Sequence, residues 1–156
     1  MRGVALRHCK HVGTMVYVAC EVLLLDGDDH ETWAEALATF RPGADARHEQ
    51  FLSDPATVAL IAQQGVGVVG WAWGYRQPRP DGHSMLLLYE IEVVEAHRRE
   101  GVGRALLDAF LDVGRREGHS KMWLLTGEDN EAAKSLYQSA GGTVTRDDVT
   151  YSWRFE

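Results

Sequence analysis

One stretch, residues 89–116, joins two different apolar periodicities through a short turn that contains glycine. In Tyr89–Val94, apolar residues alternate with glutamates at a period of two, which is typical of a strand. The next segment has apolar residues at the three- and four-residue spacing of one helical face, namely Val102, Ala105, Leu106, Ala109, Phe110 and Val113. The stretch therefore predicts a strand followed by a long amphipathic helix, residues 102–116, around which the other elements pack.

The turn between these two segments has the composition of an anion-binding site. A helix N-terminus presents unpaired backbone N–H groups and a partial positive charge. Gly101 and Gly103 allow a ligand to approach the backbone, while Arg98 and Arg99 add charge and forked donors. These features suit a diphosphate, although spacing alone is equally compatible with a solvated loop whose glycines serve only to turn the chain.

The pattern Ile91-x-Val93-x4-Arg98-x2-Gly101-x-Gly103 resembles the acetyl-coenzyme A motif of the GNAT superfamily of N-acetyltransferases. The resemblance implies that the turn holds the coenzyme A diphosphate and that the strand pairs its backbone with the pantetheine arm. It implies acetyl-CoA as the cofactor and an acyltransferase activity. The residues implied in cofactor binding are Ile91, Glu92, Val93, Arg98, Arg99, Gly101, Val102, Gly103, Arg104, Asn130, Ala133 and Tyr137.

A second segment, Asn130-x2-Ala133-x2-Leu136-Tyr137-x3-Gly141, resembles another motif of the same family. There the asparagine and tyrosine lie beside the coenzyme, and the tyrosine often protonates the departing thiolate. This chain departs from the family at Gly142, where Phe or another apolar residue is usual, and at Glu95, where proline is common.

The remaining chain predicts a mixed sheet, antiparallel in its early part, with helices on both faces. This is the α/β class and the element order of the GNAT acyl-CoA N-acyltransferase fold, with six to seven strands. A length of 156 residues predicts a single domain, 1–156. Besides the elements above, with the central strand taken as 84–94, strands are expected at 4–8, 57–63, 68–75, 122–125, 143–145 and 149–155, and helices at 12–25, 32–40, 46–52 and 131–139. The β-branched content of 12–25 leaves a strand as an alternative there.

The hairpin at residues 57–75 carries a misleading motif. Gly65–Gly70 matches the dinucleotide fingerprint GxGxxG, but that fingerprint needs a following helix, and Trp71–Tyr75 predicts a strand. A regular strand would place Gly70, Ala72 and Gly74 on one face, where another element must pack closely, and Val69, Trp71, Trp73 and Tyr75 on the other.

Acetyl transfer to an amine needs a base and an acid. Glu90 and Glu92 are the candidate bases, and in a regular strand both face one side, opposite Tyr89, Ile91 and Val93. A bulge would re-aim one of them, and an outward-facing solvated pair is the alternative. Tyr137 is the candidate acid, and a core tyrosine on an apolar helix face is its alternative. A strand N–H, such as that of Val93, would serve the oxyanion.

The acceptor follows from a closer resemblance. Tyr89-Glu90-Ile91 followed by His97-Arg98-Arg99 and Gly101 resembles the aminoglycoside 3-N-acetyltransferases of the GNAT type, which carry Tyr-Asp-Leu at the same distance. The resemblance implies direct transfer to an aminoglycoside, the 3-N position favoured, and hence antibiotic resistance. The residues expected to bind this polycation are Asp28, Asp29, Glu31, Tyr89, Glu90, Glu92, Glu128 and Asp129. For Asp28–Glu31, a solvated turn with a helix N-cap at Asp29 is the alternative.

Two other functions remain open: acetylation of another amine (a polyamine, a small metabolite or a protein lysine), and a non-catalytic coenzyme A sensor. A net charge of −7 argues against nucleic acid as a partner and suits a cationic amine. The chain has no apolar run of membrane-spanning length and no metal-ligand spacing, so neither a membrane nor a metal site is expected. Cys9 and Cys20 form no disulfide framework, which predicts a cytoplasmic protein. A homodimer is compatible with the family resemblance.

Overall fold

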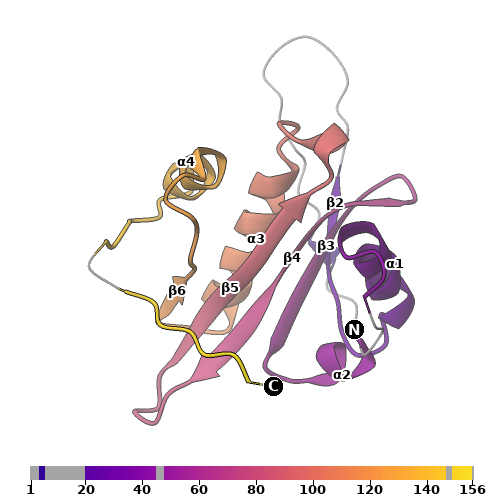
Figure 1. The fold of residues 1–156 in the computed structure, drawn as a ribbon. Coiled ribbons are helices and arrows are strands. Elements are labelled where there is room, and N and C mark those ends of the chain that lie inside the picture. Colours follow the sequence, from indigo (N-terminus) through magenta and orange to yellow (C-terminus); the bar gives the residue numbers. More distant parts are fainter. Residues whose placement is uncertain (1–3, 6–19, 45–47, 147–148, 156) are drawn as a thin grey trace. The chain divides into compact units, whose positions relative to one another are not determined.

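The computed structural model describes residues 4–5, 20–44, 48–146 and 149–155 (Figure 1). The chain divides into two compact units after Leu125, and each is described by itself. The expectation of one domain, 1–156, stays a prediction. The first unit contains β1 (Val4–Ala5), β2 (Glu21–Leu24), α1 (His30–Phe40), α2 (His48–Ser53), β3 (Thr57–Gln64), β4 (Gly67–Pro78), β5 (Ser84–Val93), the 3₁₀ turn η1 (Glu95–His97), α3 (Val102–Arg116) and β6 (Lys121–Trp123). The second contains α4 (Glu131–Ser139).

The six strands of the first unit form one sheet in sequence order, β1 to β6. Pairing is antiparallel from β1 to β5, whereas β6 runs parallel to β5, so the predicted mixed sheet is confirmed. Helix α1 packs on one face of the sheet, where Trp33 stacks on Trp71 of β4. Helix α3 packs on the other face, beside Gly70 and Gly74 of β4 (Figure 1). Among the described helices, none has both the length and the apolarity to span a membrane.

The helix expected at 12–25 is wrong over its described part. Residues 21–24 form β2, in which Leu23 pairs with Ile61 and Val22 with Ala62 of β3. A short apolar run fits a strand as well as a helix face, and pairing with β3 decides between them. Gly27 therefore caps no preceding helix, whereas Asp29 is the N-cap of α1, as in the alternative given for Asp28–Glu31, although its side chain makes no capping hydrogen bond. Residues 12–19, and residues 6–8 of the expected first strand, lie outside the described residues.

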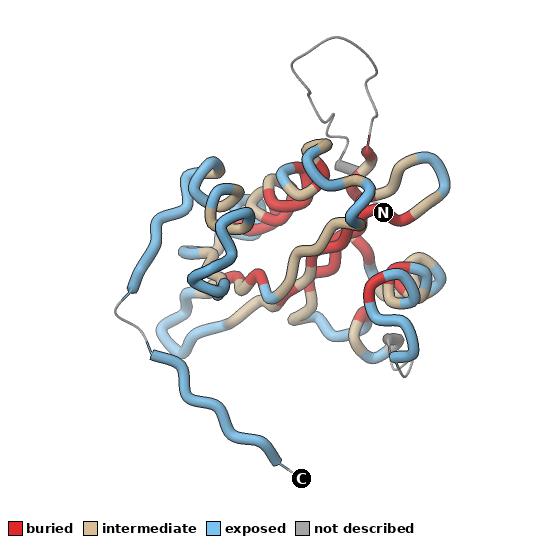
Figure 2. Tube along the Cα trace, turned by 45° about the horizontal axis from the view of Figure 1, so that its top comes forward, coloured by how far each residue is buried: buried red, intermediate tan, exposed pale blue. Residues whose placement is uncertain are grey.

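The two closing strands expected at 143–145 and 149–155 are also wrong. The described residues there form no strand, although Val149, Tyr151, Trp153 and Phe155 keep the period-two pattern. All four side chains are exposed, and Figure 2 shows the exposed stretch near the C-terminus. A period-two sequence pattern gives a segment one apolar face, but the segment becomes a strand only where a neighbouring backbone forms hydrogen bonds with it.

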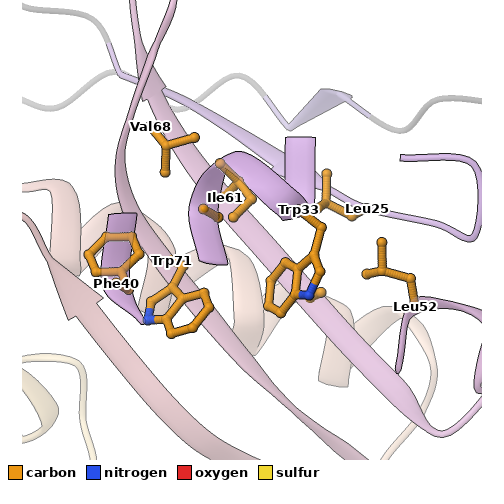
Figure 3. Close-up of a cluster of buried hydrophobic side chains, with 9 residues drawn as sticks. Leu25, Trp33, Phe40, Leu52, Ile61, Val68 and Trp71 are labelled. Carbon is orange, nitrogen blue, oxygen red and sulfur yellow. The ribbon is translucent and has the colours of Figure 1, made fainter. Parts of the chain in front are cut away.

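An aromatic core fills the space between α1, α2 and the sheet (Figure 3). Trp71 stacks on both Trp33 and Phe40 of α1, at ring-centroid distances of 5.2 and 4.9 Å. Val68, rather than the expected Val69, joins this cluster. The register explains the difference: Ala62 pairs with Gly70 but Gln63 with Val68, so Val69 is an extra residue and the alternation of β4 changes there.

On the opposite face, the glycines of β4 allow α3 to approach closely, as expected. A Cβ on Gly70 would lie 2.9 Å from Leu106 Cδ1 and 3.0 Å from Val102 Cγ1. The whole apolar stripe predicted for α3 is buried, which confirms its periodicity: Val102, Ala105, Leu106, Ala109, Phe110 and Val113. The helix ends at Arg116, and Gly118 adopts a positive φ of 72° just beyond it.

A second bulge lies in β5. Gly74 pairs with Leu88, but the preceding Trp73 pairs with Glu90, which leaves Tyr89 as an extra residue. Leu88 is buried. After the bulge, Glu90 lies beside Trp73 on the α1 side of the sheet, and Tyr89 stacks on Trp73 at 4.5 Å. Tyr89 would face away from Glu90 in a regular strand, but the strand contains the bulge that was the alternative, and the bulge places these two consecutive residues on one face.

The C-terminal end of α3 is held to the sheet by a polar network. Arg76 of β4 donates two hydrogen bonds of 2.7 Å to the Glu117 carboxylate. Glu117 Oε2 also lies 3.0 Å from His119 Nε2, and His119 Nδ1 lies 2.7 Å from Ser84 Oγ at the start of β5. Hydrogen bonding from Arg76 holds the pKa of Glu117 below its usual value. The network therefore ties three elements together through one ionised carboxylate.

Replacing Glu117 with glutamine is expected to lower the free energy of unfolding by about 1 kcal/mol at neutral pH, a modest loss because these groups are one-third exposed. Because the folded pKa is depressed, the ionised carboxylate stabilises the fold above its unfolded pKa, and this contribution disappears as pH falls through the folded pKa. Urea unfolding of both chains over a pH series measures the difference. Asp81→Asn, at an exposed pair with Arg79, is the control. A difference that stays constant with pH would contradict the assignment.

Candidate active site

Two glutamates of β5 meet an arginine from the end of α1. Glu90 and Glu92 are paired across the strand with Trp73 and Trp71, on the α1 side of the sheet. Arg41, directly after α1, contacts both carboxylates: Nη1 donates to Glu92 Oε2 at 3.0 Å, and Nη2 donates to Glu90 Oε1. We call these three residues the Arg41–Glu90–Glu92 cluster. It brings together both candidate bases and adds a cation that the sequence had not indicated.

Glu90 has the environment of a general base. Its side chain is 23% exposed, against 38% for Glu92. The Trp71 indole Nε1 donates to Glu90 Oε1 at 3.1 Å, so the carboxylate is oriented by a buried ring. Burial raises the pKa of Glu90, even though Arg41 acts in the opposite direction. A carboxylate with a raised pKa, positioned by neighbours, suits proton transfer near neutral pH.

Aromatic rings lie next to this cluster. Trp73, the cross-strand partner of Glu90, stacks on Tyr89, and Tyr75 meets Tyr89 edge-on at 6.2 Å. Tyr89 is 61% exposed. The Trp73 Nε1 atom is buried and has no hydrogen-bond partner in the described part of the chain. The carboxylates are therefore flanked by an aromatic surface that is open to solvent at Tyr89.

The far half of β5 has an open edge. The short strand β6 pairs only with residues 85–87, through Met85, Leu86 and Leu87. Beyond them, β5 continues to Val93 with β4 on one side and no strand on the β6 side among the described residues. Ile91 and Val93 pair with Ala72 and Gly70 of β4. The open edge offers backbone donors and acceptors over the same residues that carry Glu90 and Glu92.

Residues 94–101, which include η1, connect this open edge to the N-terminus of α3. Gly101 is the N-cap with φ 87°, and the preceding Arg99 has a positive φ of 69°. No side chain of the described residues caps this helix, and its first turn contains no acidic residue. Because the first-turn N–H groups meet neither a cap nor a negative charge, this end of α3 is available to an anion. Arg98 and Arg99, both exposed, are adjacent in sequence.

Specific contacts hold the turn in place. Arg98 Nε donates to the Val93 carbonyl at 3.1 Å, which ties the turn back to the end of β5. Glu100 Oε2 lies 3.2 Å from His97 Nδ1 and accepts from Gln64 Nε2 at 3.3 Å, which links the turn to β3. Arg104 is paired with Asp108 one helical turn further on. The turn is thus anchored to two strands, and Glu100 and Gln64 are contributors that the sequence patterns did not indicate.

The second unit contains the other motif. Helix α4 has the expected bounds, and the Asn130 side chain accepts from the Ala133 N–H at 3.2 Å, which confirms the expected N-cap. The same helix carries Tyr137, and burial raises the pKa of its hydroxyl above the usual tyrosine value. A neutral hydroxyl is the state in which a tyrosine can give a proton. The roles expected for Asn130, Ala133 and Tyr137 at a cofactor stay predictions.

Three other residues expected to bind substrate, Asp28, Asp29 and Glu31, do not lie in the Arg41–Glu90–Glu92 cluster. Asp28, Asp29 and Glu31 lie at the start of α1, whereas Arg41 follows its end. The 11 residues of α1 separate the two by about 16 Å. Asp26 and Asp29 accept hydrogen bonds within the turn itself, at 2.9 Å from Asp28 N and 3.0 Å from Asp26 N. Glu128 and Asp129 belong to the second unit.

Arg41 and Trp71 are the residues of this site that sequence reasoning missed. Arg41-Pro42-Gly43 marked only the end of a helix, and Trp71 marked only one face of a strand. Arg41 lies 49 and 51 positions from its two partners, so no local spacing signals the contact. One available signal was charge, because Arg41 follows the expected helix 32–40 while Glu90 and Glu92 share one face of the expected strand 84–94.

Comparisons with known proteins agree with this geometry. A family model described as "Acetyltransferase (GNAT) family" matches residues 27–141. N-acetyltransferase 8 of Rattus norvegicus is 33% identical over 96 residues, which cover 60% of this chain and 42% of the relative. Mycothiol acetyltransferase of Renibacterium salmoninarum is 32% identical over 101 residues, covering 64% of this chain and 30% of the relative. The chain thus spans less than half the length of these curated relatives.

Solved structures extend the similarity to the fold. A ribosomal-protein-alanine N-acetyltransferase from Brucella melitensis biovar Abortus 2308 superposes with a TM-score of 0.71 at 29% identity, over 88% of this chain and 100% of that one. An aminoglycoside acetyltransferase from an uncultured soil metagenomic sample, in complex with sisomicin, gives a TM-score of 0.77 at 15% identity, over 88% and 97%. At that identity the second likeness concerns the fold alone.

Proposed function

The chain belongs to the GNAT acetyltransferase family, and on that premise we propose that it is an acetyl-CoA-dependent N-acetyltransferase whose acceptor is an amine of an aminoglycoside, with the 3-N position favoured. One observation carries the proposal. One continuous segment, β5 and the turn that follows it, joins a partly buried glutamate, an open backbone edge and the uncapped N-terminus of α3. In the proposal these three parts serve, in turn, proton transfer, the pantetheine arm and the diphosphate.

The residues at the end of β5 fit coenzyme A. Its diphosphate needs donors and positive charge, and the uncapped turn at Gly101 and Gly103 with Arg98 and Arg99 offers both. Its pantetheine arm carries amides, which suit the open edge at Ile91 and Val93. The remaining proposed contacts are Glu92, Val102, Arg104, Asn130, Ala133 and Tyr137. When bound, acetyl-CoA supplies the thioester whose acetyl group is transferred.

Within this proposal, two side chains move protons. The Glu90 carboxylate takes a proton from the acceptor ammonium, which leaves a neutral amine nitrogen able to attack a carbonyl carbon. Its raised pKa makes it a stronger base than an exposed glutamate. The Tyr137 hydroxyl gives a proton to the departing sulfur. Transfer is direct, without a covalent enzyme intermediate.

The residues of the site indicate the reaction more clearly than they indicate which amine accepts the acetyl group. Glu90 and Glu92 suit a cation, and Asp28, Asp29 and Glu31 form a second acidic region that a long polycation could reach. However, about 16 Å of α1 separates the two regions, which favours a second candidate: a smaller amine or a peptide amine that uses the Glu90 region alone. The names of the relatives, which include N-acetyltransferase 8 and a ribosomal-protein-alanine N-acetyltransferase, support keeping this candidate.

A thiol-release assay with acetyl-CoA decides between these acceptors. We expect release of free coenzyme A with gentamicin-class aminoglycosides. Release with spermidine or an alanine-terminated peptide, but with no aminoglycoside, would replace the first acceptor by the second. Tight coenzyme A binding without release on any amine would instead indicate a coenzyme A sensor, and both versions of the proposal would then be wrong.

A further inference from the structure

The guanidinium of Arg41 lies where a cationic acceptor would have to bind. It pairs with both carboxylates of the Arg41–Glu90–Glu92 cluster. Its central carbon also lies 5.4 Å from the centroid of the Trp71 ring, a cation–π distance. Two carboxylates and an aromatic face are the groups that would recognise an ammonium ion, and an internal cation contacts all of them.

The contact with Glu90 occupies the same carboxylate oxygen that Trp71 orients. Glu90 Oε1 accepts from both Arg41 Nη2 and Trp71 Nε1. An acceptor ammonium that gives its proton to this oxygen would have to take the place of one donor. Trp71 is 2% exposed and stacks on both Trp33 and Phe40, so it is fixed. The side chain of Arg41 is 45% exposed and follows the end of α1, so it is the donor that can leave.

We propose that Arg41 is a specificity-determining residue: it occupies the acceptor-amine subsite at Glu90 and Glu92, and a cationic acceptor binds by displacing its guanidinium. The inference rests on the proposed function insofar as it names an acceptor amine. The occupied subsite itself is independent of which amine reacts. Ion pairs that are partly exposed are weak and exchange readily, so a ligand cation is able to compete with this arginine.

Displacement has a consequence for the binding of small cations. In Arg41→Ala, the two carboxylates and the Trp71 ring keep their places but lose their internal cation. Free guanidinium, the same chemical group without its tether, should then bind in the vacated position. In the unmodified chain, free guanidinium has to compete with the Arg41 guanidinium, whose attachment to the chain gives it a high effective concentration. Arg41→Ala should therefore bind guanidinium at about one-tenth of the concentration that the unmodified chain requires, because the tethered side chain no longer competes.

The test uses the full chain and guanidinium chloride at millimolar concentrations, with sodium chloride at equal ionic strength as the salt control. Binding is followed by the NMR signal of the Trp71 indole N–H, which a Trp71→Phe variant identifies. We expect this signal to move in Arg41→Ala at about one-tenth of the concentration needed in the unmodified chain. Arg79→Ala, at an arginine paired with Asp81, is the matched control and should behave as the unmodified chain. The proposal would be overturned if the Trp71 signal moved at the same guanidinium concentration in the unmodified chain, Arg41→Ala and Arg79→Ala.

The pH dependence of the same signal gives a second readout. The charged groups that face Glu90 are Glu92 on its own strand and Arg41 from the end of α1, while Trp71 of β4 is a neutral donor. Loss of Arg41 removes the positive charge, so the titration of Glu90 should move to higher pH. Arg41→Lys keeps a charge and should titrate between the two. A titration that does not move in Arg41→Ala would show that the arginine does not govern this carboxylate.

Kinetics then separate this inference from the proposed function. For any amine that is turned over, Arg41→Ala should lower the acceptor KM about tenfold, and guanidinium should become a competitive inhibitor of the variant. If no amine is turned over, the proposed function fails while the guanidinium titration still decides the role of Arg41. If amines are turned over but neither KM nor guanidinium binding changes, Arg41 only fastens α1 to the sheet, and the inference fails alone. If Arg41→Ala does not fold, Arg41→Lys carries the same comparison with smaller changes.

Discussion

Replacing Glu90 with glutamine is expected to lower kcat/KM for the acceptor by about 10²–10⁴-fold, the usual contribution of a general base. The glutamine amide keeps nearly the same shape but cannot take a proton from an ammonium ion. Because the α3 N-terminus and its arginines are untouched, coenzyme A should bind the variant with near-normal affinity. Steady-state thiol release and calorimetric titration with coenzyme A measure the two quantities.

Two further variants make this result specific. Glu92→Gln tests the other candidate base, and its effect should be smaller because Glu92 is more exposed and lacks the Trp71 hydrogen bond. Glu95→Gln, in the exposed 3₁₀ turn, is a matched control outside the cluster and should leave kcat/KM near that of the unmodified chain. In the unmodified chain, activity should fall as pH drops through the raised pKa of Glu90. If Glu92→Gln lost more activity than Glu90→Gln, the base assignment would move to Glu92.

Replacing Gly74 with alanine is expected to cost about 3 kcal/mol of unfolding free energy, the upper end of overpacking effects. An added Cβ would lie 1.8 Å from the Leu87 carbonyl oxygen and 3.0 Å from Phe110 Cζ. The first neighbour is backbone, so no side-chain rotation relieves the clash, and β4 must move away from β5. Thermal unfolding should show a midpoint lower by about 6–12 °C for a chain of this size.

The same substitution at another glycine gives the control. At Gly114 in α3, an added Cβ would lie 3.4 Å from Leu86 Cδ2, and alanine favours a helix over glycine by up to about 1 kcal/mol. Gly114→Ala should therefore unfold at the same temperature as the unmodified chain or slightly above it. If Gly74→Ala unfolded within 2 °C of this control, the close approach of the Leu87 carbonyl would be ruled out.

Features with a local cause were predicted well. The buried stripe of α3, the N-cap at Asn130 and the end of α3 near Gly118 follow from spacing and backbone preferences within a few residues. Features with a distant cause were not. Residues 21–24 became a strand because β3 pairs with them, and 149–155 stayed outside the sheet although their alternation is strong. Periodicity identifies an apolar face but not the partner that it meets.

The candidate site shows the same division. Glu90, the turn at Gly101 and the motif in α4 were identified from short patterns of residues close in sequence. The Arg41–Glu90–Glu92 cluster was not, because its contacts span 49 and 51 positions. Nor did the sequence locate the bulge at Tyr89, whose position follows from how β4 and β5 align. The charge pattern also suggested that Asp28–Glu31 act with Glu90, whereas α1 separates them.

The extra residue at Tyr89 determines which face of the sheet each later residue of β5 occupies. Count back from Gly74 and Leu88, and an uninterrupted ladder would put Glu90 opposite Ala72, on the side where α3 packs. A strand that kept Tyr89 in the ladder would retain both carboxylates in its sequence, yet present them to the apolar face of α3 instead of to solvent, whereas deleting Tyr89 would leave Glu90 opposite Trp73 as it is now. The bulge therefore decides which face of the sheet carries Glu90 and Glu92, and the order of residues along β5 alone does not reveal that face.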